Sequence, residues 1–300
     1  MLFKWEGVLP ALITPFTVDD TVDMSLFKKS LLAQLSAGVR GIILGGSLGE
    51  GGQLKIDEKK QLVEAALTQV GQEVPIILNI GESTTGEAIR QVRLAFDWGV
   101  SGIMLLPPLR YKPDYRETNT YFRAVAESTE LPIMIYNNPV DYGVGITIEM
   151  FEELAGVSNI TAVKESTRDV TNVTRMYNHF GERYQILCGV DTLAMEELLL
   201  GAHGWVAGLV CAFPDETVRL YDLIRAGKLS EAATLYRWFM PLLELDIHPK
   251  LVQYIKLAAS VTGLGSEYVR APRLILEGEE RERILKVISK SISTRPLIDH

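Results

Sequence analysis

The sequence contains little cysteine: Cys188 and Cys211 are the only two among 300 residues. Neither belongs to a CxxC pair, so they cannot build the disulfide framework of a small secreted domain, and we expect both to be buried thiols. Proline and glycine number only 13 and 25, while the hydrophobic fraction is 47%. These values exclude a collagen-like or disordered chain and leave enough apolar side chains for a large core.

Positive charge is also scarce, since the formal net charge is −8 at pH 7. No run of Lys and Arg provides the electrostatic footprint that nucleic-acid binding needs. The sequence lacks a stretch of 18 consecutive apolar residues, and its first residues lack the basic and then apolar pattern of a secretory signal. We therefore expect a cytoplasmic protein whose partners are small molecules or copies of itself, with neither nucleic acid nor a membrane among them.

Sequence motifs for metals and nucleotides are missing too. The sequence has no HExxH motif and no close His/Cys cluster, and its four histidines are scattered: His179, His203, His248 and His300. Because metal sites need such spacing, we predict no metal site. No Gly-Lys-Ser/Thr follows a glycine-rich loop, so nucleotide binding is weakly supported.

Eight short apolar runs recur along the chain and alternate with longer stretches of helical period. This repeat of a strand, a loop and a crossover helix predicts a parallel sheet. Eight such units favour a (β/α)₈ TIM barrel, with a doubly wound sheet as the alternative. The predicted strands lie in residues 8–13, 41–45, 75–80, 102–106, 132–136, 160–164, 184–188 and 204–209.

About 90 residues follow the last predicted strand, more than one closing helix requires. They show helical period near residues 215–226, 230–245, 250–261 and 279–291. We expect residues 1–213 to form the barrel core, and residues 214–300 to form the last barrel helix and a C-terminal helical extension packed on it.

In a barrel of this kind, the residues that end each strand face the active-site loops. The sixth run ends in Lys164, directly after apolar residues. Strands of a parallel barrel are covered on both faces, so this amine would be desolvated, which lowers its pKa and makes it nucleophilic. The fifth run ends in Tyr136, Asn137 and Asn138, which places a phenol and two amides at the same end.

A glycine-rich turn, residues 45–52, ends the second run. Its backbone N–H groups could approach an anion closely, although such turns are also common structural elements at strand–helix junctions. Residues 45–49 also match the GxSxG pattern of a hydrolase nucleophile elbow. No HGGG-type oxyanion motif accompanies that pattern, so the hydrolase alternative has little support.

Together, these segments resemble the dihydrodipicolinate synthase/N-acetylneuraminate lyase family of class I aldolase-like barrels. The resemblance spans nearly the whole chain and depends on four motifs in order: residues 7–16, 45–50, 136–139 and 163–166. The 28-residue separation between Tyr136 and Lys164 also matches the family's tyrosine-to-lysine spacing.

The resemblance implies that Lys164 forms a Schiff base with a 2-oxo acid and that Tyr136 transfers protons. It implies that Ser47 and the amides of its loop, with Gly46 and Leu48, hold the substrate carboxylate. A protonated imine is an electron sink, so the adjacent C3 proton becomes acidic without any further cofactor. The family usually forms homotetramers, and we expect one here.

Several residues differ from the synthase pattern, and these differences reduce the number of reactions that the sequence supports. Leu48 stands where the synthase has a second threonine of its proton relay, and Asp141 stands where it has an arginine that binds the second substrate's carboxylate. A carboxylate there would repel an acidic partner, which disfavours lysine-pathway synthesis. Arg110, followed by Tyr111, stands where the synthase has a tyrosine from the neighbouring subunit.

Other segments resemble the hydroxyproline-degrading branch, the 1-pyrroline-4-hydroxy-2-carboxylate deaminases. They are residues 47–50, 137–139, 142–143, 236–240 and 250–253. This resemblance predicts deaminase activity on a cyclic imino acid, with the distal end of the substrate recognised by Asn138, Asp141 and Tyr142. We also include Val206, in the eighth run, among the substrate-binding residues.

Four alternatives remain open. A 2-keto-3-deoxy sugar-acid aldolase or dehydratase, or dihydrodipicolinate synthase itself, would use the same imine chemistry. A barrel that binds 2-oxo acids without turnover belongs to another class, since fold alone does not establish activity. A metal-dependent aldolase would lose its activity with a chelator.

Overall fold

The computed structural model describes residues 4–71, 73–108 and 110–296, and in them eight parallel strands form one sheet. The strand order β1-β8-β7-β6-β5-β4-β3-β2 leaves β1 and β2 as the remaining neighbours, and a parallel bridge from Ala11 to Ile43 joins them. The sheet is thus a nearly closed (β/α)₈ TIM barrel, as predicted, and the doubly wound alternative is wrong. The strands are β1 Gly7–Pro10, β2 Ile42–Leu44, β3 Ile76–Ile80, β4 Gly102–Leu105, β5 Ile133–Asn137, β6 Ile160–Glu165, β7 Gln185–Cys188 and β8 Gly204–Ala207.

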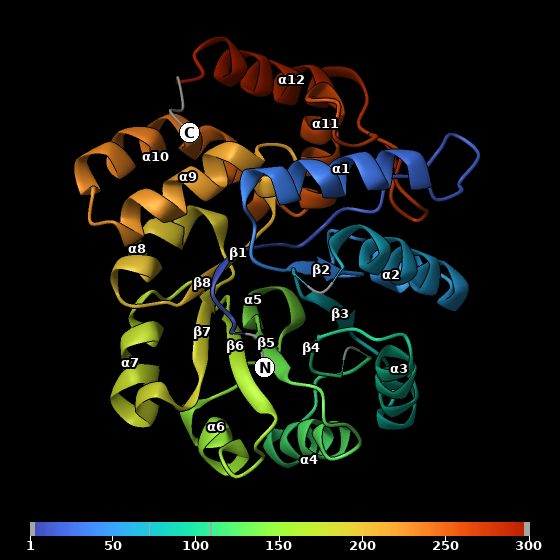
Figure 1. The fold of residues 1–300 in the computed structure, drawn as a ribbon, viewed down its shortest axis with the longest axis vertical. Coiled ribbons are helices and arrows are strands. Elements are labelled where there is room, and N and C mark those ends of the chain that lie inside the picture. Colours follow the sequence, from blue (N-terminus) through green and yellow to red (C-terminus); the bar gives the residue numbers. More distant parts are fainter. Residues whose placement is uncertain (1–3, 72, 109, 297–300) are drawn as a thin grey trace.

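Helices between the strands surround the barrel (Figure 1). They are α1 Met24–Ala37, α2 Ile56–Val70, α3 Thr85–Asp97, α4 Tyr115–Ala126, α6 Ile148–Leu154, α7 Thr171–Phe180, α8 Ala194–Leu199 and α9 Pro214–Arg225. Local sequence sets their ends: Thr84 accepts a hydrogen bond from the Glu87 amide at the start of α3, and Gly38 ends α1 in the left-handed conformation. Short 3₁₀ turns precede or follow several strands: η1 Gly51–Gln53, η2 Gly181–Arg183, η3 Asp191–Leu193 and η4 Leu209–Cys211.

The predicted C-terminal helices are present as α10 Leu229–Leu243, α11 Leu251–Val261 and α12 Gly278–Ser293. A 3₁₀ turn, η5 Glu244–Ile247, links the first two. Figure 1 shows all three helices gathered on the side of the barrel that also carries α1 and α9. The division at residue 213 stays a prediction, because η4 and α9 simply continue the chain after β8.

The core consists mainly of buried aliphatic and aromatic side chains. Every residue of β3 and β5 is buried, as expected for parallel strands covered on both faces. Cys188 and Cys211 are both buried free thiols, which confirms the expectation from their spacing. No helix in the described part of the chain is both long enough and apolar enough to cross a membrane.

Candidate active site

Tyr136 and Lys164 lie side by side at the carboxyl ends of β5 and β6, because their Cα atoms are direct partners in the parallel ladder. The Lys164 Nζ atom is 4.1 Å from the centre of the Tyr136 ring. Both side chains are only 7% exposed. Lys164 also has room only because residue 189 is glycine: a methyl group there would lie 2.7 Å from Lys164 Cε and 2.1 Å from Ser166 Oγ.

Burial controls the ionisation of this pair. Burial lowers the pKa of Lys164, and the negative charges that Asp246 and Asp191 carry when they are ionised oppose that change only in part. Burial also raises the pKa of Tyr136, so its phenol keeps its proton at neutral pH. A neutral amine beside a protonated phenol is the arrangement that nucleophilic attack on a carbonyl or imine carbon needs.

The pair opens into a cavity of about 680 Å³ at this end of the barrel. The cavity is large enough for a small organic acid. It is lined by nine of the ten residues predicted from the sequence: Gly46, Ser47, Leu48, Tyr136, Asn138, Asp141, Tyr142, Lys164 and Val206.

Arg110 is the exception. It does not line this cavity, and its guanidinium Nε instead donates to Ser83 Oγ at 3.2 Å on the exposed surface. Its predicted role at a neighbouring subunit's site stays a prediction.

Hydrogen bonds connect the loop after β2 with the segment after β5. Ser47 Oγ lies 2.5 Å from the Tyr142 hydroxyl, and the Tyr142 ring meets the Tyr136 ring edge-on at 5.5 Å. Asn138 begins the short helix α5 Pro139–Tyr142, where its Nδ2 donates to the Tyr136 hydroxyl at 3.0 Å and to Asp141 Oδ2 at 2.7 Å. Because Ser47 bonds a phenol, the described residues give it no imidazole base, and the nucleophile-elbow alternative loses its support.

Several cavity residues were not among those predicted. Ser166 and Arg168 follow Lys164 directly, so their position after β6 was a usable signal. Arg168 lies 3.9 Å from Asp141 and offsets part of the negative charge there. By contrast, Asp246, His248 and Arg273 reach the cavity from the C-terminal extension. That contact depends on tertiary packing, and no local sequence pattern indicates it.

A buried ionic network attaches this extension to the glycine-rich loop. Lys256 of α11 donates to Glu50 Oε1 at 2.5 Å and to the Tyr268 carbonyl at 2.6 Å, and neither Lys256 nor Glu50 is exposed. The backbone amide of Arg270 donates to the other oxygen of Glu50 at 3.0 Å. Burial lowers the pKa of Lys256 to about 8.

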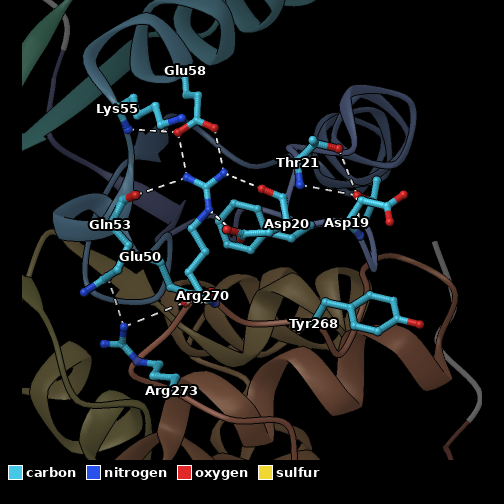
Figure 2. A network of polar contacts seen from close by, with 12 residues as sticks. Asp19, Asp20, Thr21, Glu50, Gln53, Lys55, Glu58, Tyr268, Arg270 and Arg273 are labelled. Carbon is cyan, nitrogen blue, oxygen red and sulfur yellow. Dashed lines mark hydrogen bonds and ion pairs between the residues drawn. The ribbon is translucent and has the colours of Figure 1, made fainter.

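Arg270 is the centre of the outer part of the network (Figure 2). Its guanidinium makes a two-pronged contact with Glu58 at 2.6 Å and also contacts Asp20 at 2.8 Å. Arg273, which lines the cavity, donates to the side chain of Gln53 at 3.0 Å. The loop that carries Ser47 is therefore fixed from outside the barrel by residues more than 200 positions later.

Comparisons with known proteins show the family of this chain. A sequence model of the Dihydrodipicolinate synthetase family matches residues 4–291. The 4-hydroxy-tetrahydrodipicolinate synthase of Methanosarcina barkeri is 30% identical over 290 residues, covering 95% of this chain and 98% of the relative. The crystal structure of dihydrodipicolinate synthase from Aquifex aeolicus has a TM-score of 0.91 at 26% identity, with 98% of this chain and all of that chain covered. A Bacillus anthracis dihydrodipicolinate synthase also has a TM-score of 0.91, at 27% identity over 96% of this chain and 98% of that chain. This chain belongs to the dihydrodipicolinate synthetase family.

Proposed function

We propose that this protein is a Schiff-base-forming lyase that acts on a small 2-oxo acid or cyclic imino acid through Lys164. The observation that carries this proposal is the position of the buried Lys164 amine, 4.1 Å from the centre of the Tyr136 ring in the cavity at the end of the barrel. The amine supplies the nucleophile, and the imine supplies the electron sink, so the reaction uses no additional cofactor. Ser47 and the amides of its loop would hold the substrate carboxylate.

Within this chemistry, the best candidate is 1-pyrroline-4-hydroxy-2-carboxylate deaminase. Lys164 attacks C2 of the cyclic imine, and the C2–N1 bond breaks to open the ring. Tyr136 assists proton transfer as C3 loses a proton, after which the C4 hydroxyl leaves. A proton shift from C5 forms a second imine there. Hydrolysis of that imine releases ammonia, and hydrolysis of the imine on Lys164 releases 2-oxoglutarate semialdehyde.

Two features of the cavity support this candidate over synthesis with a second acidic substrate. Leu48 presents an apolar side chain beside Ser47, and Asp141 presents a carboxylate on the opposite segment. The repulsion expected from Asp141 is weaker than the sequence alone indicated, because Arg168 lies close to it.

A second candidate, 4-hydroxy-tetrahydrodipicolinate synthase, is favoured by the names of the relatives. Product analysis separates the candidates: ammonia release marks the deaminase, pyruvate release a sugar-acid aldolase, and a cyclic diacid the synthase. Loss of ammonia release in Lys164→Ala, with full activity in the control Lys60→Ala, would support the proposal. Lys60 is suitable because it is an exposed lysine on α2. Full activity of Lys164→Ala would overturn it.

Two other outcomes would change the class of function. Calorimetric binding of a 2-oxo acid without any product would favour a binding barrel, and loss of activity with a chelator would favour a metal-dependent aldolase.

We also propose that the protein assembles as a homotetramer in which Arg110 contacts a neighbouring subunit's site. Arg110 is exposed and lies outside its own cavity. Sedimentation velocity measures the assembly. A monomer that retains full activity would contradict both parts of this proposal.

A further inference from the structure

Asp246 and Asp191 influence the pKa of Lys164, and Asp141 lines the same cavity. Two of these three aspartates already have hydrogen-bond partners. Asp191 is fully buried at the end of β7 and accepts hydrogen bonds from Trp205 Nε1 at 2.9 Å and the Leu209 amide at 2.8 Å. Asp141 accepts from Asn138 at 2.7 Å and also lies near Arg168. These contacts fix both carboxylates as structural acceptors.

Asp246 differs from these two aspartates because its side chain has no such partner among the residues that the structure describes. It belongs to η5 of the C-terminal extension and lines the same cavity as Lys164. No hydrogen bond or ion pair within the described ranges 4–71, 73–108 and 110–296 involves its side chain. Its position follows from Gly208: a methyl group there would lie 2.1 Å from Asp246 Oδ1 and 2.8 Å from Leu48 Cδ1. The carboxyl group therefore lies across the end of β8, next to the apolar side chain of Leu48.

The surroundings of Asp246 favour its protonated form. Burial has the largest effect and raises its pKa well above the ordinary value. Asp191 on η3 and Asp141 on α5 act in the same direction, while Lys164 on β6 and Arg168 after it act in the opposite direction. A raised pKa favours the protonated form of this side chain, which can donate a proton, whereas the two bonded aspartates would lose acceptor contacts on protonation.

We propose that Asp246 is the general acid that protonates the leaving C4 hydroxyl of the substrate imine bound to Lys164. The proposal depends on the proposed imine chemistry and names a further catalytic residue for it. It also defines the substrate class: 2-oxo or imino acids that carry a hydroxyl two carbons from the imine carbon.

The step balances within the site. The enamine electron pair forms the C3–C4 double bond, the C4–O bond breaks, and the oxygen leaves as water with the proton of Asp246. The lysine nitrogen regains its positive charge as an iminium. Asp246, now a carboxylate, recovers its proton from the water that hydrolyses the imine.

The test compares Asp246→Asn with the wild-type protein in two reactions. The first is exchange of the pyruvate methyl protons in D₂O, which needs Lys164 but has no leaving hydroxyl. The second is turnover of 1-pyrroline-4-hydroxy-2-carboxylate or 2-keto-3-deoxygluconate. We expect Asp246→Asn to lose turnover by about 100-fold or more and to lose far less of the exchange rate, because exchange has no leaving hydroxyl. The matched control is Glu244→Gln, an exposed carboxylate on the same 3₁₀ turn, which should retain both reactions.

Two further readouts distinguish an acid from a structural residue. Borohydride should trap on Asp246→Asn an adduct one water heavier than the dehydrated adduct of the wild type. The wild-type turnover rate should also fall as pH rises through the pKa of Asp246, and this decline should be absent from the residual activity of the variant.

Other results would overturn the assignment. These are wild-type turnover in Asp246→Asn, a parallel loss of pyruvate exchange and turnover, or a wild-type protein that exchanges pyruvate protons but dehydrates neither hydroxylated substrate. Failure of the proposed function looks different, since the wild-type protein would then show no pyruvate exchange at all.

Discussion

At the scale of single residues, the site depends on one amine and the space around it. Lys164 is buried beside Tyr136, and Gly189 leaves the volume that its side chain occupies. A surface lysine would be protonated and solvated, whereas here desolvation favours the neutral nucleophile. The reactivity expected of Lys164 therefore depends on its buried position at the end of β6 as well as on its being a lysine.

Substitution of Gly189 by alanine should displace Lys164. The added methyl group would lie 2.7 Å from Lys164 Cε, closer than such atoms can approach. We expect at least a tenfold loss in the rate of adduct formation with pyruvate, measured by borohydride quenching and intact mass. Gly156→Ala is the control, since a methyl group at that position meets no atom within 4 Å. Equal rates in the two variants would contradict this packing argument.

The pH dependence of imine formation follows from the direction of the Lys164 shift. Only the neutral amine attacks, so the rate of adduct formation should rise with pH and level off above the pKa of Lys164. Burial lowers that pKa, so the midpoint should lie below the ordinary value of a lysine side chain. This midpoint is measured by quenching the pyruvate reaction with borohydride at a series of pH values. A midpoint at the value of an exposed lysine would show that Lys164 is not desolvated.

At the scale of elements, the strands and most helices could be predicted because their signals are local. Apolar runs define β1 to β8, and the longer stretches of helical period between them define the helices. The predicted ends of the strands were less accurate. The strand predicted at residues 204–209 ends at Ala207 in the structure, and Leu209 already belongs to the 3₁₀ turn Leu209–Cys211. The short helix α5 was not predicted, because its four residues are too few to show a helical period.

The ionic network between α11 and the glycine-rich loop offers a test at this scale. Lys256→Met would leave the buried Glu50 carboxylate with only its longer ion pair to Arg273 at 3.8 Å, at a cost of about 3 kcal/mol in the free energy of unfolding. Urea unfolding measures this change. The double variant Glu50→Gln with Lys256→Met removes both charges and should recover part of the loss. Equal stability of Lys256→Met and the wild type would contradict the role given to this pair.

At the scale of the whole molecule, the site is assembled from both ends of the chain. The barrel supplies Lys164, Tyr136 and Ser47, which could be predicted because each lies at or just after the carboxyl end of a strand. The extension supplies Asp246 and His248, which the sequence does not indicate. Their contribution depends on how α10 and α11 pack over the end of the barrel, and long-range packing leaves no periodic signal in one sequence.

The most direct test of the central claim is borohydride trapping followed by peptide mapping. The protein is incubated separately with pyruvate, 2-keto-3-deoxygluconate and 1-pyrroline-4-hydroxy-2-carboxylate, then reduced and digested. The Schiff-base account predicts a single adduct on the peptide that contains Lys164, and its absence from Lys164→Ala. An adduct confined to other lysines, or none with any of the three compounds, would contradict it.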